Sequence, residues 1–148
     1  MFKRIDHVAL VVSDLDEAIE LYQRTFQVEF TIRERNEEQG FEVATFEVGD
    51  QHIELLLPTR PDSVIAGFLE KRGPGLHHLA LEVEHLSQIA DQLKASGLHM
   101  TSNTPRLGTG GSRIHFIHPK SLFGALVELV ELPRKDQRDE TGESLQET

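Results

Sequence analysis

Cysteine and tryptophan are absent from this chain of 148 residues, and tyrosine occurs only once. Without cysteine the chain has no disulfide framework and no thiolate chemistry. No apolar run approaches the ~20 residues that a helix needs to cross a bilayer, and the first seven residues, MFKRIDH, lack the hydrophobic segment of a secretion signal. We therefore expect a cytoplasmic protein that has no membrane partner.

Positive charge is also scarce, since 15 lysines and arginines stand against 25 aspartates and glutamates, a net charge of −10. A protein that neutralises phosphates needs a basic surface, so we expect no nucleic-acid partner. A small anionic molecule remains compatible with this charge, because a few local cations or a bound metal ion can attract it into a pocket. The chain length fits one domain, or two half-size modules that share a core.

The chain contains two similar stretches, RIDHVALVV at residues 4–12 and GLHHLALEV at residues 75–83. Each is typical of a β-strand, and each precedes a stretch with apolar residues at helical spacing. His78 lies 71 positions after His7, and Glu128 lies 74 positions after Glu54. Two pairs of residues at nearly the same offset indicate an internal repeat.

The repeat predicts an α+β fold made of two tandem β-α-β-β-β modules that form an open curved sheet. Module one spans residues 1–60, a linking helix 61–73 and module two 74–133. The polar tail, residues 134–148, is expected to be disordered. The expected strands are 4–12, 29–35, 41–49 and 52–58 in module one, and 75–83, 98–102, 112–119 and 125–132 in module two.

Strand alternation places His7, Glu54, His78 and Glu128 on the face of the sheet that turns away from the helices. Two imidazoles and two carboxylates form a suitable ligand set for a divalent transition metal. A single one of these residues would be interpreted as a surface group, but their repetition favours a metal site. His77 has the opposite parity to His78 and is expected to support the ligands or the structure. The histidines without a partner at the repeat offset are expected to be structural or exposed: His52, His85, His99, His115 and His118.

Five motifs carry a resemblance to a known family: IDHVAL, NEEQG, DSVIAGFLEKRGPGLHHLALEV, LGTGGSRIHFIHPKS and GALVELVE. Through them, residues 5–133 resemble the vicinal oxygen chelate superfamily, which has the fold of glyoxalase I, and are most similar to its methylmalonyl-CoA epimerase family. The sequence HPKS after the glycine-rich GTGG is the motif most specific to that family.

The resemblance implies a cup of β-strands around one divalent ion, either cobalt, zinc, nickel or manganese. It implies that His7, Glu54, His78 and Glu128 are the metal ligands. The activity it implies is an isomerase that interconverts the two epimers of methylmalonyl-CoA through a metal-stabilised enolate. Glu128 is then the first candidate for the catalytic base, and Glu54 would serve the opposite face of the substrate. A small-molecule acyl-CoA substrate and a homodimer are the implied partners.

Two positions depart from that family. Many epimerases have glutamine where this chain has Glu54, which makes the ligand set closer to that of bacterial glyoxalase I. Some have a glutamate base where this chain has Val43, and the adjacent Glu42 could replace it only if a bulge reversed its side of the strand. A glyoxalase I-like lyase or isomerase acting on a thiol adduct is therefore the main alternative, ahead of an extradiol dioxygenase or a metal-free drug-binding protein.

Overall fold

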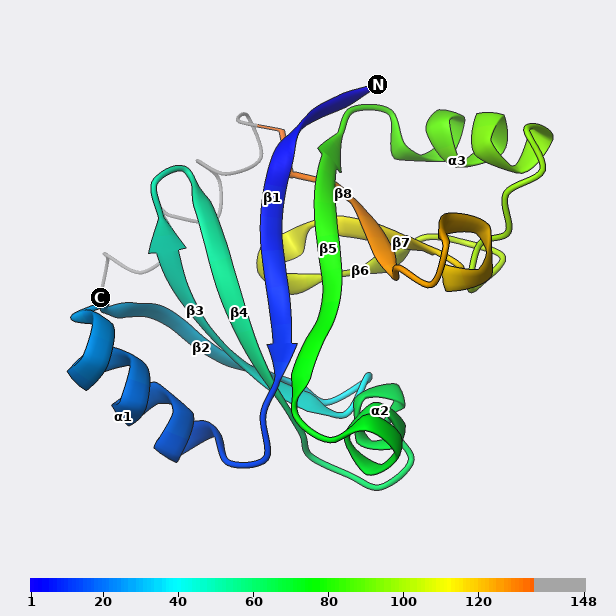
Figure 1. Cartoon of the computed structure of the whole chain (residues 1–148). Helices are drawn as coiled ribbons and strands as arrows, with labels where there is room; N and C mark the ends of the chain where they lie inside the picture. Colours follow the sequence, from blue (N-terminus) through cyan, green and yellow to red (C-terminus); the bar gives the residue numbers. More distant parts are fainter. Residues whose placement is uncertain (135–148) are drawn as a thin grey trace, which may run out of the picture.

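The computed structural model describes residues 1–134, so the tail beyond Arg134, predicted to be disordered, lies outside the described residues. Eight strands of one sheet and three α-helices make up this part of the chain (Figure 1). Module one contains β1 (Phe2–Val11), α1 (Leu15–Phe26), β2 (Phe30–Asn36), β3 (Phe41–Val48) and β4 (Gln51–Pro58). The linking helix α2 (Val64–Arg72) leads to module two, with β5 (Gly75–Val83), α3 (Leu86–Ala95), β6 (Arg106–Leu107), β7 (Arg113–Ile117) and β8 (Val127–Glu131).

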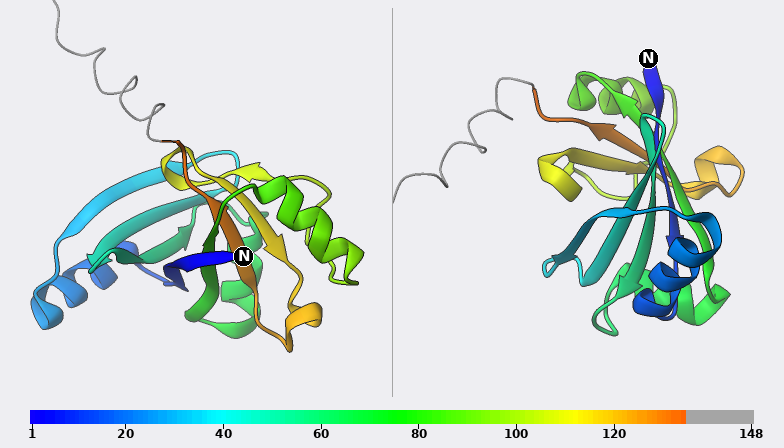
Figure 2. Two further views of the ribbon diagram at one scale, coloured as in Figure 1. Left: turned by 90° about the horizontal axis from the view of Figure 1, so that it is seen from above. Right: turned by 90° about the vertical axis from the view of Figure 1, so that its left-hand side faces the viewer.

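The strand order of the sheet is β2-β3-β4-β1-β5-β8-β7-β6, which is symmetric about its centre. At the centre β1 and β5 pair antiparallel, and each has a parallel neighbour from its own module, β4 beside β1 and β8 beside β5. The two modules are therefore related by an approximate two-fold axis between β1 and β5. The sheet curls around a concave side (Figure 2). This arrangement confirms the predicted α+β fold with tandem modules.

Helix α1 covers the outer side of module one. Asp14 caps it, because its Oδ1 accepts a hydrogen bond from the Glu17 backbone N–H at 2.9 Å. The apolar positions at helical spacing then pack with Leu55 and Ala44 of the sheet. Helix α3 covers module two in the same way, with Leu86 in a cluster that includes Leu129. These outer contacts leave the opposite side of the sheet free for the predicted polar residues.

Helix α2 closes one end of the concave side. Its cap is Ser63, whose Oγ accepts from the Ala66 backbone N–H at 3.0 Å. Ile65 of this helix packs in a buried cluster with Ala9, Val11, Val43 and Leu56. The link between the modules is thus part of the core on the concave side.

The strand predicted at residues 98–102 is wrong. Only one isolated bridge forms there, between Met100 and Ile117, and the edge of the sheet is instead the short strand β6. Met100 and Leu98 pack against the core cluster under α3, so the segment serves as packing below the helix. Across residues 1–134, no helix is both long and apolar enough to cross a membrane.

Candidate metal centre

The four predicted ligands lie on the four central strands of the sheet. His7 is on β1, His78 on β5, Glu54 on β4 and Glu128 on β8. All four side chains are buried, with 6–7% of each exposed. The curved sheet therefore places each of them on its concave side, as the strand alternation predicted.

Two alanines create the space that these side chains fill. Ala9 of β1 pairs with both His78 and Glu54, and Ala80 of β5 pairs with both His7 and Glu128. Both alanines are fully buried. A small residue at each of these positions lets the long polar side chains from the strands on either side converge.

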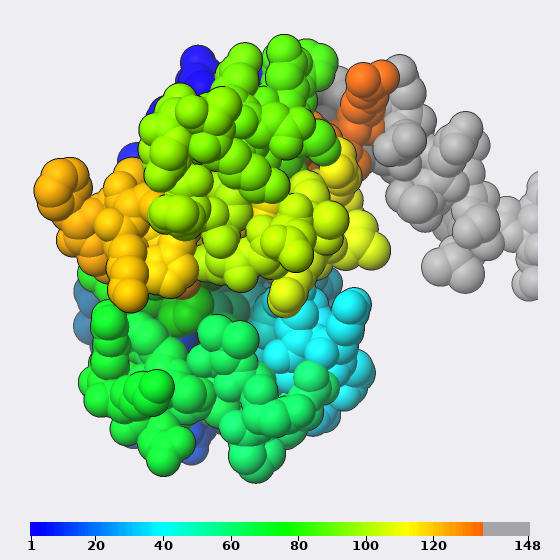
Figure 3. All heavy atoms as spheres, turned by 90° about the vertical axis from the view of Figure 1, so that its right-hand side faces the viewer, coloured from blue at the N-terminus to red at the C-terminus, as the bar shows by residue number. Residues whose placement is uncertain are grey.

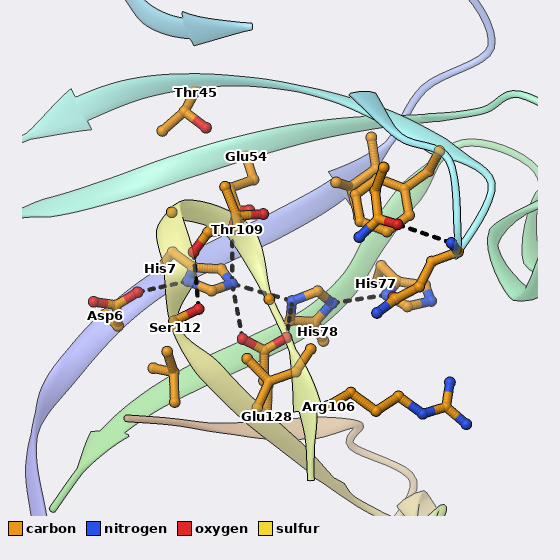
Figure 4. Close-up of a pocket in the computed structure, with 18 of the residues that line it drawn as sticks. Asp6, His7, Thr45, Glu54, His77, His78, Arg106, Thr109, Ser112 and Glu128 are labelled. Carbon is orange, nitrogen blue, oxygen red and sulfur yellow. Dashed lines mark hydrogen bonds and ion pairs between the residues drawn. The ribbon is translucent and has the colours of Figure 1, made fainter. Parts of the chain in front are cut away.

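The four side chains meet around the two histidine rings (Figure 4). His7 Nε2 lies 2.9 Å from Glu54 Oε2, 3.2 Å from His78 Nε2 and 3.6 Å from Glu128 Oε1, and His78 Nε2 lies 3.3 Å from Glu128 Oε2. Ligand atoms of His7, His78 and Glu128 all lie within 4.8 Å of one another. Glu54 joins this group through its contact with His7.

Burial and hydrogen bonding act in opposite directions on the pKa of His7. Burial alone would lower this pKa, but hydrogen bonds with Asp6 and Glu54 outweigh it and raise the pKa to about 10. Burial alone would raise the pKa of Glu54, but hydrogen bonds with His52 and His7 hold it far below its usual range. The buried carboxylates of the centre therefore strongly stabilise a positive charge that lies among them.

This donor set fits a divalent cation. Two imidazole nitrogens aim at one point from the two modules, and one carboxylate accompanies each of them. A nitrogen and oxygen set of this kind suits zinc, cobalt, nickel or manganese. A cation at this point would compensate the two buried carboxylates, whose enclosure without a counter-charge is costly.

Asp6 is a partner of this centre that neither the repeat nor strand alternation predicted. Its Oδ2 lies 2.7 Å from His7 Nδ1, and its Oδ1 accepts a hydrogen bond from Arg4 Nη2 at 3.0 Å. Alternation predicts His77 on the opposite side of β5, yet its Nδ1 lies 2.8 Å from His78 Nδ1, which agrees with its expected role as a support of the ligands. Simple alternation fails at both positions, because the pairing of β1 with β5 is irregular next to each of them.

His52 is a further residue of the centre that the repeat offset did not indicate. Its ring stacks on His7 with the centroids 4.8 Å apart, and its Nε2 lies 3.7 Å from Glu54 Oε2. A signal for this contact was present in the sequence, because His52 lies two positions before Glu54 and so shares its side of β4. The other histidines without a repeat partner are not among the residues that line the cavity, except for the buried His115.

The centre lies in a cavity of about 1020 Å³ that both modules line. Figure 3 shows the surface hollowed between module two and the α2 side of module one. The glycine-rich loop at residues 108–112 forms part of the wall, and Gly110 has a φ of 67°, which favours glycine. Arg60 and Arg106 also line the cavity; Arg60 is paired with Asp62 at 2.8 Å, so the local positive charge comes from Arg106.

Glu42 is not a residue of this cavity. The register of β3 with β4 runs without a shift through Glu42 and Val43, so no bulge changes their sides. Glu42 accepts a hydrogen bond from Arg33 Nε at 2.6 Å on the outer side, where Arg33 also binds Asp16 of α1. Val43 is buried in the apolar cluster beside α2. Neither residue can supply the second base.

Comparison with known proteins agrees with this fold. The family model of the glyoxalase/bleomycin resistance protein/dioxygenase superfamily matches residues 6–116. The ethylmalonyl-CoA/methylmalonyl-CoA epimerase of Cereibacter sphaeroides is 37% identical over 134 residues, which cover 89% of this chain and 100% of the relative. The crystal structure of methylmalonyl-CoA epimerase from Mycobacterium tuberculosis superposes with a TM-score of 0.87 at 40% identity, over 93% of each chain.

A third relative was solved with a ligand. A Streptomyces coelicolor methylmalonyl-CoA epimerase variant in complex with 2-nitronate-propionyl-CoA superposes with a TM-score of 0.85 at 36% identity. The match covers 90% of this chain and 100% of that one. The similarity thus includes a protein that holds an acyl-CoA analogue.

Proposed function

This chain belongs to the glyoxalase/bleomycin resistance protein/dioxygenase superfamily, and from that premise we propose that it interconverts the two epimers of methylmalonyl-CoA with the help of one divalent metal ion. Relatives of matching length carry the name of this epimerase, and the chain is an enzyme of the isomerase class. The metal ion, the base residues and the substrate are the parts of the proposal that experiments must test.

One observation carries the proposal: two buried carboxylates lie on opposite sides of the histidine pair (Figure 4). Epimerisation removes the proton between a thioester and a carboxylate and returns a proton to the other face. The reaction therefore needs an acid or base group on each face of the reacting carbon. Glu54 of module one and Glu128 of module two supply such a pair.

Each residue then has a role at a stated atom. Glu128 takes the proton from one face at a carboxylate oxygen, and Glu54 serves the other face in the same way. His7 and His78 would hold the cation through Nε2, together with the two glutamates. When bound, a divalent ion supplies Lewis-acid stabilisation of the negative charge that the substrate oxygens acquire. Arg106 at the cavity wall attracts the anionic substrate, although the chain as a whole is acidic.

Deuterium exchange tests the two base assignments. Methylmalonyl-CoA in D₂O should gain deuterium at its C2 carbon in the presence of the metal-loaded wild type, well above the rate without enzyme. We expect Glu128→Gln to slow the exchange of one epimer and Glu54→Gln that of the other, each by ~10²–10⁴-fold, the range for loss of a general base. Mass spectrometry of the thioester gives the exchange rate.

Metal content must be measured in the same samples. A variant that retains one metal ion per chain but loses exchange supports a base role, whereas a variant that loses both has lost a ligand. Absence of exchange with a fully loaded wild type would contradict epimerase activity on this compound. Exchange that is undiminished in both variants would remove the two glutamates from the chemistry.

A glyoxalase I-like isomerase is the second candidate, because Glu54 completes a ligand set of two histidines and two glutamates. That reaction also removes a proton from a carbon beside a carbonyl group and returns a proton to the adjacent carbon. The adduct of methylglyoxal with glutathione is the substrate that distinguishes the two activities. Turnover of this adduct without any exchange of methylmalonyl-CoA would favour the second candidate.

A further inference from the structure

The pairing of β1 with β5 contains one unpaired residue immediately before each ligand histidine. Ile5 pairs with Leu81 and His7 with Ala80, so Asp6 has no partner on β5. On the other strand, Ala9 pairs with His78 and Leu10 with Leu76, so His77 has no partner on β1. Each is the extra residue of a β-bulge, which bends the strand and redirects a side chain.

The two bulges have the same consequence in the two modules. Adjacent strand residues normally point to opposite faces, but here the bulged residue turns toward the histidine that follows it. Asp6 Oδ2 reaches His7 Nδ1 at 2.7 Å, and His77 Nδ1 reaches His78 Nδ1 at 2.8 Å (Figure 4). Both ligand histidines are therefore held at Nδ1, while both Nε2 atoms face the centre at a separation of 3.2 Å.

The contact between His77 and His78 fixes the place of one proton. Two imidazole nitrogens at 2.8 Å need a single N–H between them, because a neutral ring has one donor and one acceptor nitrogen. His78 can bind a cation through Nε2 only if its own proton is on Nδ1. His78 then donates this hydrogen bond, and His77 accepts it.

We propose that His77 is a positioning residue that accepts the Nδ1–H of His78 and so keeps its Nε2 free for the metal ion. The proposal rests on the metal-binding part of the proposed function. The ring of His77 is itself held in place, because it packs edge-on against Phe68 of α2 with the centroids 4.9 Å apart. His77 thus does for module two what Asp6 does for module one, with a neutral ring in place of a carboxylate.

Two variants distinguish the role of His77 as a hydrogen-bond acceptor from the packing of its ring. His77→Phe keeps a ring against Phe68 but removes the acceptor, whereas His77→Asn keeps an acceptor oxygen near the position of Nδ1. We expect His77→Phe to bind zinc ~10–100-fold more weakly than the wild type, the usual effect of losing such a partner. His77→Asn should retain most of the affinity. Competition with a chromophoric chelator measures zinc binding directly, without an activity assay.

Histidine side-chain nitrogen NMR of the zinc-loaded proteins gives a second readout. In the wild type, His78 should show a proton on Nδ1 that exchanges slowly with water and a zinc-bound Nε2. This proton should exchange faster in His77→Phe and remain protected in His77→Asn. A purely structural role of His77 would instead lower the thermal stability of the metal-free protein, with no link to the Nδ1 proton.

Several results would overturn the proposal. Zinc affinity of His77→Phe equal to that of the wild type is one, and a His78 ring that binds zinc through Nδ1 is another. A wild type that binds no zinc would overturn both the proposal and the metal part of the proposed function. Zinc binding with the expected ranking, in a protein without epimerase activity, would support the role of His77 while contradicting the proposed reaction.

Discussion

At the scale of single residues, Asp6 is the hydrogen-bond partner of His7, the histidine whose pKa is raised to about 10. Its contact with His7 Nδ1 at 2.7 Å favours the imidazole orientation that directs Nε2 to the centre. Arg4 and Glu82 continue this contact toward the surface, with Arg4 Nε 2.5 Å from Glu82 Oε2. Asp6 is thus fixed by a cation on one side while it orients His7 on the other.

Removal of the Asp6 charge should weaken metal binding. We expect Asp6→Asn to lower the affinity for zinc by ~10–100-fold, because the ligand histidine loses a charged acceptor. Isothermal titration with a competing chelator measures this change. Asp16→Asn, at a carboxylate with 82% of its side chain exposed, is the matched control and should bind as the wild type does. Equal affinities in the two variants would show that His7 does not depend on Asp6.

The residues of the centre divide into those the sequence could predict and those it could not. His7, Glu54, His78 and Glu128 follow from the repeat offset together with strand parity. Asp6 could not be found in this way, because parity assumes regular pairing and Asp6 occupies a bulge. His77 was expected to support the ligands or the structure, but its bulge places it on the other side of β5 than parity predicts. The positions of the bulges depend on how β1 and β5 pair, which a single sequence does not reveal.

At the scale of elements, the caps of α1 and α2 each have a rival residue beside them. Ser13 precedes Asp14 and Asp62 precedes Ser63, and serine and aspartate are both favoured at a helix N-cap. The structure selects Asp14 and Ser63, because their side-chain oxygens reach the backbone N–H three positions later. Propensity alone cannot choose between neighbours that are both good caps.

The cap of α1 can be tested by its effect on stability. Asp14→Ala should reduce the free energy of unfolding by ~1 kcal/mol, because the Glu17 backbone N–H loses its acceptor. Urea denaturation of the metal-free protein measures the change. Ser13→Ala is the matched control, since Ser13 is not the cap, and it should unfold close to the wild type. A larger loss in Ser13→Ala than in Asp14→Ala would contradict this assignment.

The edge of module two shows why some strand predictions fail. Residues 98–102 alternate as a strand would, yet Met100 and Leu98 are used to fill the core below α3. Only Met100 of this segment forms a bridge, and the edge strand of the sheet consists of Arg106 and Leu107. Packing against a helix decided the conformation here, and strand propensity did not.

At the scale of the whole molecule, the candidate metal centre connects the two modules across β1 and β5. Each module supplies one histidine and one glutamate, so a bound ion ties both halves of the sheet together. The tandem arrangement followed from the repeat, whereas the curvature that brings the four side chains together depends on sheet pairing and twist. The sequence therefore predicted the parts of the centre and their common side but not their distances.

Metal removal should lower the stability of the whole chain. A ligand that binds only the folded state stabilises it by ~2.7 kcal/mol at a free concentration 100 times its dissociation constant. We therefore expect a clear fall in melting temperature when a chelator is added to the zinc-loaded protein. The double variant Glu54→Gln, Glu128→Gln should show a much smaller difference. A wild-type melting temperature that does not change with saturating zinc would argue against a metal centre.

The approximate two-fold axis between β1 and β5 also bears on the handedness of the substrate. Two stereoisomers that differ at one carbon approach a reactive site as near mirror images in the vicinity of that carbon. A site with a base on one side only would react with one stereoisomer and not with the other. Glu54 and Glu128 occupy equivalent positions in the two modules, each paired with an alanine of the central strands. In the proposed reaction, either stereoisomer would therefore meet a carboxylate, one supplied by each module.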